Sequence, residues 1–163
     1  MSDFTKLSPE ELRKHKGLSF TGVTTAFLCH DGQGNLLLGK RSAHARDEHG
    51  RWDPGAGGLK HGQSVEESMR REVKEEYGVE PKKVNFIGYF DAFRKTDAGH
   101  DSHWVVMCFA VLVDRSQVCI NEPNAIDEIG WFTLDALPEP LHSQIPKFMS
   151  LHGDTLRKYM DKQ

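Results

Sequence analysis

Short runs of apolar, β-branched and aromatic residues alternate along the chain with clusters of Gly, Asp and Asn, a pattern typical of a sheet-containing protein. The first run, residues 18–30, is rich in Thr and apolar residues. Residues 31–34 (Asp-Gly-Gln-Gly) have the composition of a hairpin turn, which predicts a return strand at 35–40. A polar stretch at 41–51 is predicted to be a loop. Further strands are predicted at 52–58, as a glycine-rich strand or turn, and at 84–93, 103–113 and 129–133.

Two segments carry clear helix-start signals. A Ser-Pro pair predicts a short N-terminal helix over about 8–16. The clearest helix is predicted to begin at Ser64, because Ser64 and Glu67 fit a capping box, and to end at Gly78.

The C-terminal segment 141–159 also has a helical pattern, which Pro146 and Gly153 are expected to interrupt. Strands on both sides of one central helix, with helices near the ends, predict a single layered α/β domain over residues 1–163. Its core is expected to occupy about residues 18–150.

Composition excludes several classes of protein. The chain has 163 residues, 21 Lys and Arg against 24 Asp and Glu, and a net charge of −3, which argues against a nucleic-acid coat or a basic membrane anchor. Three scattered cysteines do not form a disulfide framework. The longest strongly apolar run, 104–113, is about half a membrane span, and the N-terminus lacks a signal pattern. We therefore expect a cytoplasmic protein with no stable nucleic-acid partner and no membrane association.

Acidic residues are concentrated on the central helix, where six of the 24 lie within residues 66–80. At about 100° per residue, the apolar stripe of this helix consists of Val65, Met69, Val73 and Tyr77. Glu72, Glu75 and Glu76 lie beside that stripe, at i, i+3 and i+4. A solvated helix face is the usual explanation of such a run. Carboxylates next to a buried stripe are costly, however, unless a hard cation such as Mg²⁺ neutralises them, so their position favours a metal site.

Glycines precede this helix in the run Gly55-Ala56-Gly57-Gly58. A tight turn explains such a run equally well on its own. Directly before the acidic helix, it predicts a backbone that approaches a metal ion or a phosphate closely. Arg71 lies four residues after Glu67 and four before Glu75, and it is expected to pair with either of them on the flank.

The segment from Gly57 to Val79 resembles the Nudix box of the Nudix hydrolase family, whose signature is G, five residues, E, seven residues, then R-E-U-x-E-E-x-G-U with U bulky and aliphatic. Eight positions match without a gap, from Gly57 through Arg71-Glu72-Val73, Glu75-Glu76 and Gly78-Val79. The resemblance implies an α/β/α sandwich with a mixed β-sheet over roughly residues 18–150. It leaves a homodimer open.

The resemblance also implies roles for the matching residues. Glu72, Glu75 and Glu76, with the backbone at Gly57, would ligate Mg²⁺ or Mn²⁺, and Arg71 would orient the carboxylates. Such a centre activates a water for in-line attack on phosphorus. The implied reaction is hydrolysis of a diphosphate bond, either in a nucleoside diphosphate linked to another moiety or in a nucleoside triphosphate.

One position departs from the signature, because Gln63 stands where the family has its first Glu. Gln keeps an oxygen acceptor but has no charge, so we expect weaker metal binding or fewer bound metals. Family members often use a further acid from a later loop. The candidates are Glu122 and Glu128, and Glu128 is preferred because it lies three residues before the Trp131-Phe132 strand.

The sequence gives weaker signals for substrate-binding residues than for the acidic helix. Arg41 and Arg51, at strand ends near the box, are predicted to contact phosphate, although ordinary surface charge explains them too. The stretches 121–123 (Asn-Glu-Pro) and 101–104 (Asp-Ser-His-Trp) are similar to segments of nucleotide-cleaving Nudix enzymes, which implies a small nucleotide-type substrate. The aromatic residues considered for stacking a base, most of them expected to be core, are Phe4, Phe20, Phe27, Phe90, Phe93 and Trp104.

Two other functions remain open on the same fold. An isopentenyl-diphosphate isomerase would need a catalytic cysteine near the turn, and residues 52–62 contain none. A nucleotide-binding module that has lost turnover is favoured by Gln63, whereas the three retained carboxylates of the helix argue against it. The nine histidines have no cysteines at zinc-ligand spacing, so a structural zinc is not predicted.

Overall fold

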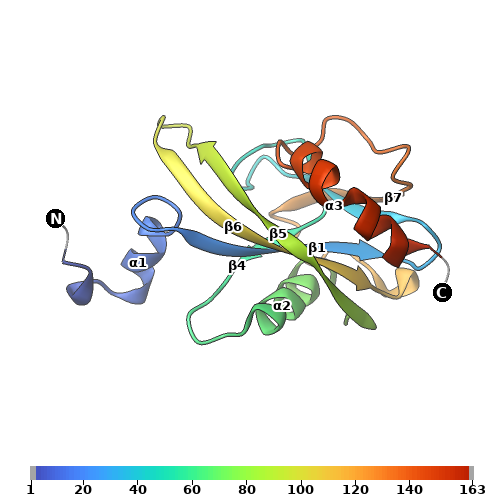
Figure 1. The fold of residues 1–163 in the computed structure, drawn as a ribbon, viewed down its shortest axis with the longest axis horizontal. Helices are drawn as coiled ribbons and strands as arrows, with labels where there is room; N and C mark the ends of the chain where they lie inside the picture. The colour runs from blue at the N-terminus through green and yellow to red at the C-terminus, as the bar shows by residue number, and fades with distance from the viewer. Residues whose placement is uncertain (1–2, 162–163) are drawn as a thin grey trace.

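The computed structural model describes residues 3–161, and its centre is a seven-stranded mixed sheet (Figure 1). The order of hydrogen-bonded strands in the sheet is β3-β2-β1-β6-β5, and in addition β4 pairs with β1 and β7 pairs with β2. The strand bounds are β1 Gly22–His30, β2 Leu36–Arg41, β3 Trp52–Asp53, β4 Ala56–Gly58, β5 Lys83–Lys95, β6 Asp101–Leu112 and β7 Ile126–Phe132. β1 and β6 are parallel, from Gly22 opposite Trp104 to His30 opposite Leu112, and the other pairs are antiparallel.

Helices α2 (Val65–Tyr77) and α3 (Ile145–Met160) lie on opposite sides of this sheet (Figure 1). Alternating residues of β1 supply both layers, because neighbouring side chains of a strand point to opposite faces. Phe27 packs in the core with α2, whereas Leu28 packs in the core with α3. The expected α/β/α sandwich with a mixed sheet is confirmed.

The remaining helical segments are short. They are η1 (Phe4–Lys6), α1 (Pro9–His15) and η2 (Arg115–Gln117). Ser8 caps α1 in a full capping box, as the Ser-Pro signal predicts. In the part of the chain that the structure describes, no helix is long and apolar enough to cross a bilayer.

Several strand ends differ by a few residues from the sequence prediction, and two differences have a clear physical reason. The first strand begins at Gly22 rather than at residue 18, because Gly17 adopts a φ of 80° and starts a turn. The C-terminal helix is continuous. Pro146 occupies its first turn, where proline costs no hydrogen bond, and Gly153 is buried inside the helix. The predicted interruption is therefore wrong.

The loop between β2 and β3 is fixed by buried charges. Glu48 accepts hydrogen bonds from the backbone N–H and the hydroxyl of Ser143 at 2.7 and 2.5 Å, and its carboxylate lies 2.6 Å from the Arg94 guanidinium. Burial opposes ionisation of Glu48. The hydrogen bonds from Ser143 and the charges of His142 and Arg94 outweigh it, so that the pKa of Glu48 lies below its ordinary value. One carboxylate thus joins the loop, β5 and the segment before α3.

We predict that Glu48→Gln lowers the free energy of unfolding by about 1.5–3 kcal/mol at pH 7, the usual contribution of hydrogen bonds to a charged group. Because folding lowers this pKa, the contribution is complete above the ordinary Glu pKa of about 4.3 and is lost as the pH falls through the folded value. Urea unfolding of the wild type and the variant from pH 7 down to pH 3 tests this. Glu139→Gln, at an exposed loop position, is the control. A difference between wild type and Glu48→Gln that does not shrink on acidification contradicts the prediction.

Candidate active site

The carboxylates of α2 are positioned by local signals in the helix itself. The Ser64–Glu67 capping box sets where the helix starts, and Gly78, in the left-handed conformation, ends it. Met69 and Val73 are fully buried against the sheet, which fixes the rotation of the helix about its axis. The boundaries, the cap and this buried stripe are as predicted.

A hydrogen bond ties the end of this helix to the glycine-rich segment. The buried Tyr77 hydroxyl donates to the Pro54 carbonyl at 3.1 Å. It holds the turn between β3 and β4 against the same helix turn that carries Glu76. The acidic helix and the glycine run are therefore packed together.

Two glycines allow the carboxylates to reach this backbone. A Cβ atom on Gly57 would lie 1.9 Å from Cδ of Glu72, and one on Gly55 would lie 2.8 Å from Oε2 of Glu76. Gly55 also has a φ of 108°, which L side chains rarely adopt. The Gly57 carbonyl, a predicted metal ligand, accepts hydrogen bonds from the hydroxyls of Thr24 and Thr25 at 2.9 and 3.2 Å. Only glycine fits at these contacts.

The site concentrates negative charge. Burial first, and then the charges of Asp53, Glu72 and Glu122, raise the pKa of Glu76 well above its ordinary value, and Arg41 opposes them. Burial also raises the pKa of Glu72 against the opposing effect of Arg71. These directions identify a buried acidic centre with too little positive charge from the protein itself.

Arg71 neutralises part of this centre. Its Nη1 atom lies 2.7 Å from Oε1 of Glu72 and 2.8 Å from Oε2 of Glu75, so it pairs with Glu75 as expected and with Glu72 as well. Its Nε donates to the amide oxygen of Gln63 at 3.3 Å. Gln63 therefore acts here as a neutral acceptor for the arginine that orients the carboxylates.

The residues fit a divalent cation by their chemistry. Glu72 and Glu76 supply hard oxygen donors, and burial raises the pKa of both carboxylates. Over residues 3–161, however, no group of three or more His, Cys, Asp and Glu side chains already converges as a metal cage. Glu72 and Glu75 are both engaged by Arg71 instead. Metal ligation by Glu75 would require that its ion pair with Arg71 opens.

The two candidates for a further acid lie in different places. The charge of Glu122 raises the pKa of both Glu72 and Glu76. Glu128, which the sequence prediction preferred, lies on β7 opposite Lys40, with 60% of its side chain exposed and 3.9 Å between its carboxylate and the Lys40 ammonium. Glu122 therefore acts electrostatically on Glu72 and Glu76, whereas β7 places Glu128 beside Lys40 of β2. The choice between the two acids stays a prediction.

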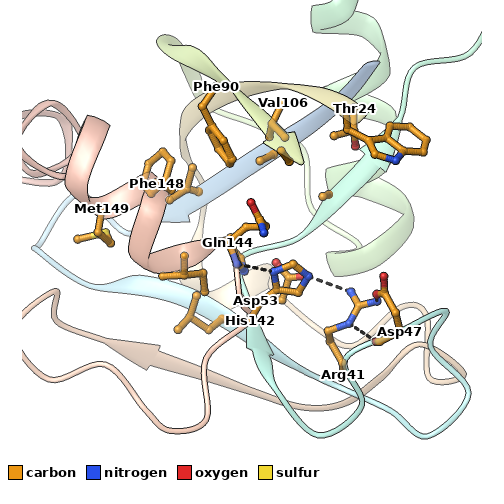
Figure 2. Close-up of a pocket in the computed structure, with 18 of the residues that line it drawn as sticks. Thr24, Arg41, Asp47, Asp53, Phe90, Val106, His142, Gln144, Phe148 and Met149 are labelled. Atoms are coloured by element: carbon orange, nitrogen blue, oxygen red, sulfur yellow. Dashed lines mark hydrogen bonds and ion pairs between the residues drawn. The ribbon is translucent and has the colours of Figure 1, made fainter. Parts of the chain in front are cut away.

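A cavity of about 350 Å³ lies next to the acidic centre, on the α3 side of the sheet. Figure 2 shows its apolar wall, with Phe90, Val106 and Phe148 pointing inward, and its polar end. Ala56 and Gly58 of β4 line the cavity, whereas Gly57 between them faces Glu72. A single layer of backbone, the strand β4, therefore separates the cavity from the carboxylate of Glu72.

The two predicted phosphate contacts have different surroundings. Arg41 lines the cavity, and its guanidinium lies 2.9 Å from Asp53 and 2.8 Å from Asp47 (Figure 2). Arg51 is exposed and donates to the Leu141 carbonyl at 2.9 Å, and it does not belong to the residues that line the cavity. Arg41 is therefore the better placed of the two for contact with a substrate in the cavity.

Sequence reasoning missed several polar residues of the cavity. They are Asp47, Asp53, Arg94, His142 and Gln144. Asp53 had a usable signal, since it begins the Asp-Pro-Gly turn before the glycine run. The others come from distant loops and strands, and no local pattern marks them. Of the aromatic candidates for base stacking, Phe90 and Trp104 line the cavity. The side chain of Phe4 lies outside the described residues.

Comparison with known proteins identifies the family. A family profile described as NUDIX domain matches residues 20–152. NAD-capped RNA hydrolase NudC of Pseudomonas aeruginosa (strain LESB58) is 33% identical over 89 residues, 55% of this chain and 29% of that protein. NAD-capped RNA hydrolase NudC of Chromobacterium violaceum is 31% identical over 116 residues, 71% of this chain and 40% of that protein. The chain thus spans well under half the length of these relatives.

Solved structures agree with this. The MutT NUDIX hydrolase from Burkholderia pseudomallei is 26% identical with a TM-score of 0.70, over 80% of this chain and 97% of that one. The MutT protein from Methanosarcina mazei Go1, at 21% identity and a TM-score of 0.69 over 83% and 94% of the two chains, shows the same fold. Because the family profile covers most of the 163 residues, the chain belongs to the NUDIX domain family.

Proposed function

We propose that this chain is a divalent-metal-dependent pyrophosphohydrolase. Its substrate would be a nucleoside diphosphate linked to another moiety or a nucleoside triphosphate. The observation that carries the proposal is the half-buried pair Glu72 and Glu76, packed on a glycine backbone that borders the cavity. Family membership and the hydrolase relatives support the class of reaction.

Glu72 and Glu76 would hold Mg²⁺ or Mn²⁺, joined by Glu75 when its ion pair with Arg71 opens. The cation, when bound, neutralises the diphosphate and lowers the pKa of a water that attacks phosphorus. Arg71 orients Glu72 and Glu75. Arg41, anchored by Asp47 and Asp53, supplies positive charge to the phosphates from the cavity side.

The other proposed site residues have supporting roles. Gly57 keeps the backbone in contact with Glu72. Glu122 would act as the further acid, with Glu128 as the alternative. Arg51 would contact only a substrate group that extends out of the cavity.

A reducing cytoplasm is the proposed compartment, supported by Cys29, Cys108 and Cys119, which are free thiols in the structure. Because the NudC relatives are named as NAD-capped RNA hydrolases, NAD-capped RNA should be tested as a substrate together with free nucleotides.

We predict that Glu76→Gln lowers kcat by at least about 100-fold, as expected for a group that stabilises charge in the transition state. The variant should not lose stability, because burial disfavours the charged form of Glu76 and a neutral amide avoids that cost. Glu66→Gln removes the same charge from the exposed face of the same helix and should change kcat little. Phosphate release from a nucleotide panel, after pyrophosphatase treatment, and thermal unfolding measure both effects.

Retained turnover in Glu76→Gln contradicts the assignment. The rival function, a binding module without turnover, predicts heat of nucleotide binding by calorimetry with no product from the wild type. An isomerase remains disfavoured because residues 52–62 contain no cysteine.

Divalent cations should stabilise the protein independently of turnover. We expect saturating Mn²⁺ or Mg²⁺ to raise Tm by about 5 °C, since a ligand that binds only the folded state stabilises it. Gln63→Glu should lower the half-saturating concentration by about tenfold, the size typical of groups that support metal ligands. Differential scanning fluorimetry, with NaCl at equal ionic strength as the control, measures both shifts. An unchanged Tm in Mn²⁺ argues against a metal site here.

The two acids can be separated by matched variants. We predict that Glu122→Gln lowers kcat by about tenfold or more, because its charge acts on Glu72 and Glu76. Glu128→Gln should stay within about twofold, because a largely exposed ion pair contributes little. Steady-state kinetics under saturating metal compare the two. A larger loss in Glu128→Gln reverses the assignment.

A further inference from the structure

We propose that Trp104 is the platform on which the planar base of the substrate stacks, and that it thereby sets the preference for nucleotides over simple diphosphates. This inference rests on the function proposed above and extends it to a further residue of the same cavity. The residue belongs to the Asp-Ser-His-Trp stretch at the start of β6, and its indole lines the cavity.

The ring of Trp104 is held in place by two glycine backbones. Gly22 of β1 is its register partner, and a Cβ there would lie 2.4 Å from Cε3 of the indole. A Cβ on Gly17 would lie 2.2 Å from the indole Nε1. The Gly17 carbonyl also accepts a hydrogen bond from the backbone N–H of His103 at 2.8 Å. Glycine at both positions leaves room for the indole to lie against the backbone, and this close packing fixes its orientation before any ligand binds.

A planar cation already covers the ring. The guanidinium carbon of Arg46 lies 5.7 Å from the centroid of the Trp104 ring, in the geometry of a cation–π contact. Arg46 is easily displaced, because 76% of its side chain is exposed and its ion pair with Asp47 is long, at 3.9 Å. A delocalised, planar group is therefore accepted on this ring, and a base could exchange with it.

The rest of the cavity suits a base more than a second phosphate at this end. Apart from Arg46, its walls near Trp104 include the apolar residues Phe90, Ala92 and Val106. Figure 2 shows Phe90 and Val106 on the same side of the cavity as Thr24, away from Arg41 and Asp47. Apolar side chains beside an aromatic ring are typical of base recognition without sequence preference.

The position of Trp104 also agrees with the proposed binding of the substrate phosphates near Glu72 and Glu76. Thr24 of β1 is paired on one side with Gly58 of β4 and on the other with Val106 of β6. The glycine strand beside the carboxylates and the strand that carries Trp104 are thus neighbours of one β1 segment. A nucleotide stacked on Trp104 can direct its diphosphate along β1 toward Glu72 and Glu76.

Tryptophan fluorescence tests this without relying on turnover. Nucleoside 5′-diphosphates, titrated without divalent metal, should quench the wild type saturably. Trp104→Phe keeps an aromatic ring but leaves only Trp52 and Trp131 to emit, and its emission should not change. Quenching that persists in Trp104→Phe, or an unquenched wild type that binds the nucleotide by calorimetry, overturns the proposal.

Calorimetry then gives the size of the effect. Trp104→Leu should weaken nucleoside diphosphate binding by about 5- to 150-fold, the range for loss of one base–aromatic stack, and leave inorganic pyrophosphate binding unchanged. Phe93→Leu is the matched control, since Phe93 is an exposed aromatic residue of β5, the strand next to β6, and does not line the cavity. Equal losses for both ligands would overturn the proposal. Should Trp104→Leu fail to fold, the quenching result for Trp104→Phe decides.

These measurements separate the two proposals. Quenching with no hydrolysis of any nucleotide keeps Trp104 as a binding platform and rejects the pyrophosphohydrolase. Hydrolysis with an unchanged KM in Trp104→Leu keeps the enzyme and rejects the platform.

Discussion

The contact between a buried glutamate and a backbone without side chains governs this structure. Glu72 packs on Gly57 so closely that no Cβ fits between them, and Glu76 approaches Gly55 in the same way. Such carboxylates are stable inside a protein only with compensation, which Arg71 supplies for one part of the wall and Arg41 for another. The helix register, the Tyr77 hydrogen bond to Pro54 and the glycine run all serve to maintain this contact.

The local features of the site could be predicted from the sequence because they depend on neighbours in the chain. The Ser64 cap, the Gly78 end and the position of Glu72 and Glu76 beside a buried stripe are examples. Glu122 was not preferred over Glu128, because the choice depends on how a distant loop folds over α2. The continuous α3 was missed for another reason: Pro146 is read as a breaker unless the helix start is known.

The polar end of the cavity could not be predicted from the sequence, because its residues come from segments that are distant in the chain. Asp47 lies between Arg41 and Arg94, which come from different strands. Only the β2-β1-β6-β5 order of the sheet brings those strands to one cavity. The charges that line the cavity are therefore a property of topology, whereas the position of Glu72 and Glu76 is a property of one helix.

The parallel pairing of β1 with β6 has a consequence for how the molecule forms. Two parallel strands that are far apart in the chain must close a long loop before they can form hydrogen bonds. The entropy cost of that loop is met before any bond offsets it, which makes folding slow and cooperative. The box helix has the strongest local signals, yet the surface it packs on includes Phe109 and Val111 of β6. A nascent chain that has just completed α2 therefore carries Glu72 and Glu76 without the surroundings that raise their pKa values.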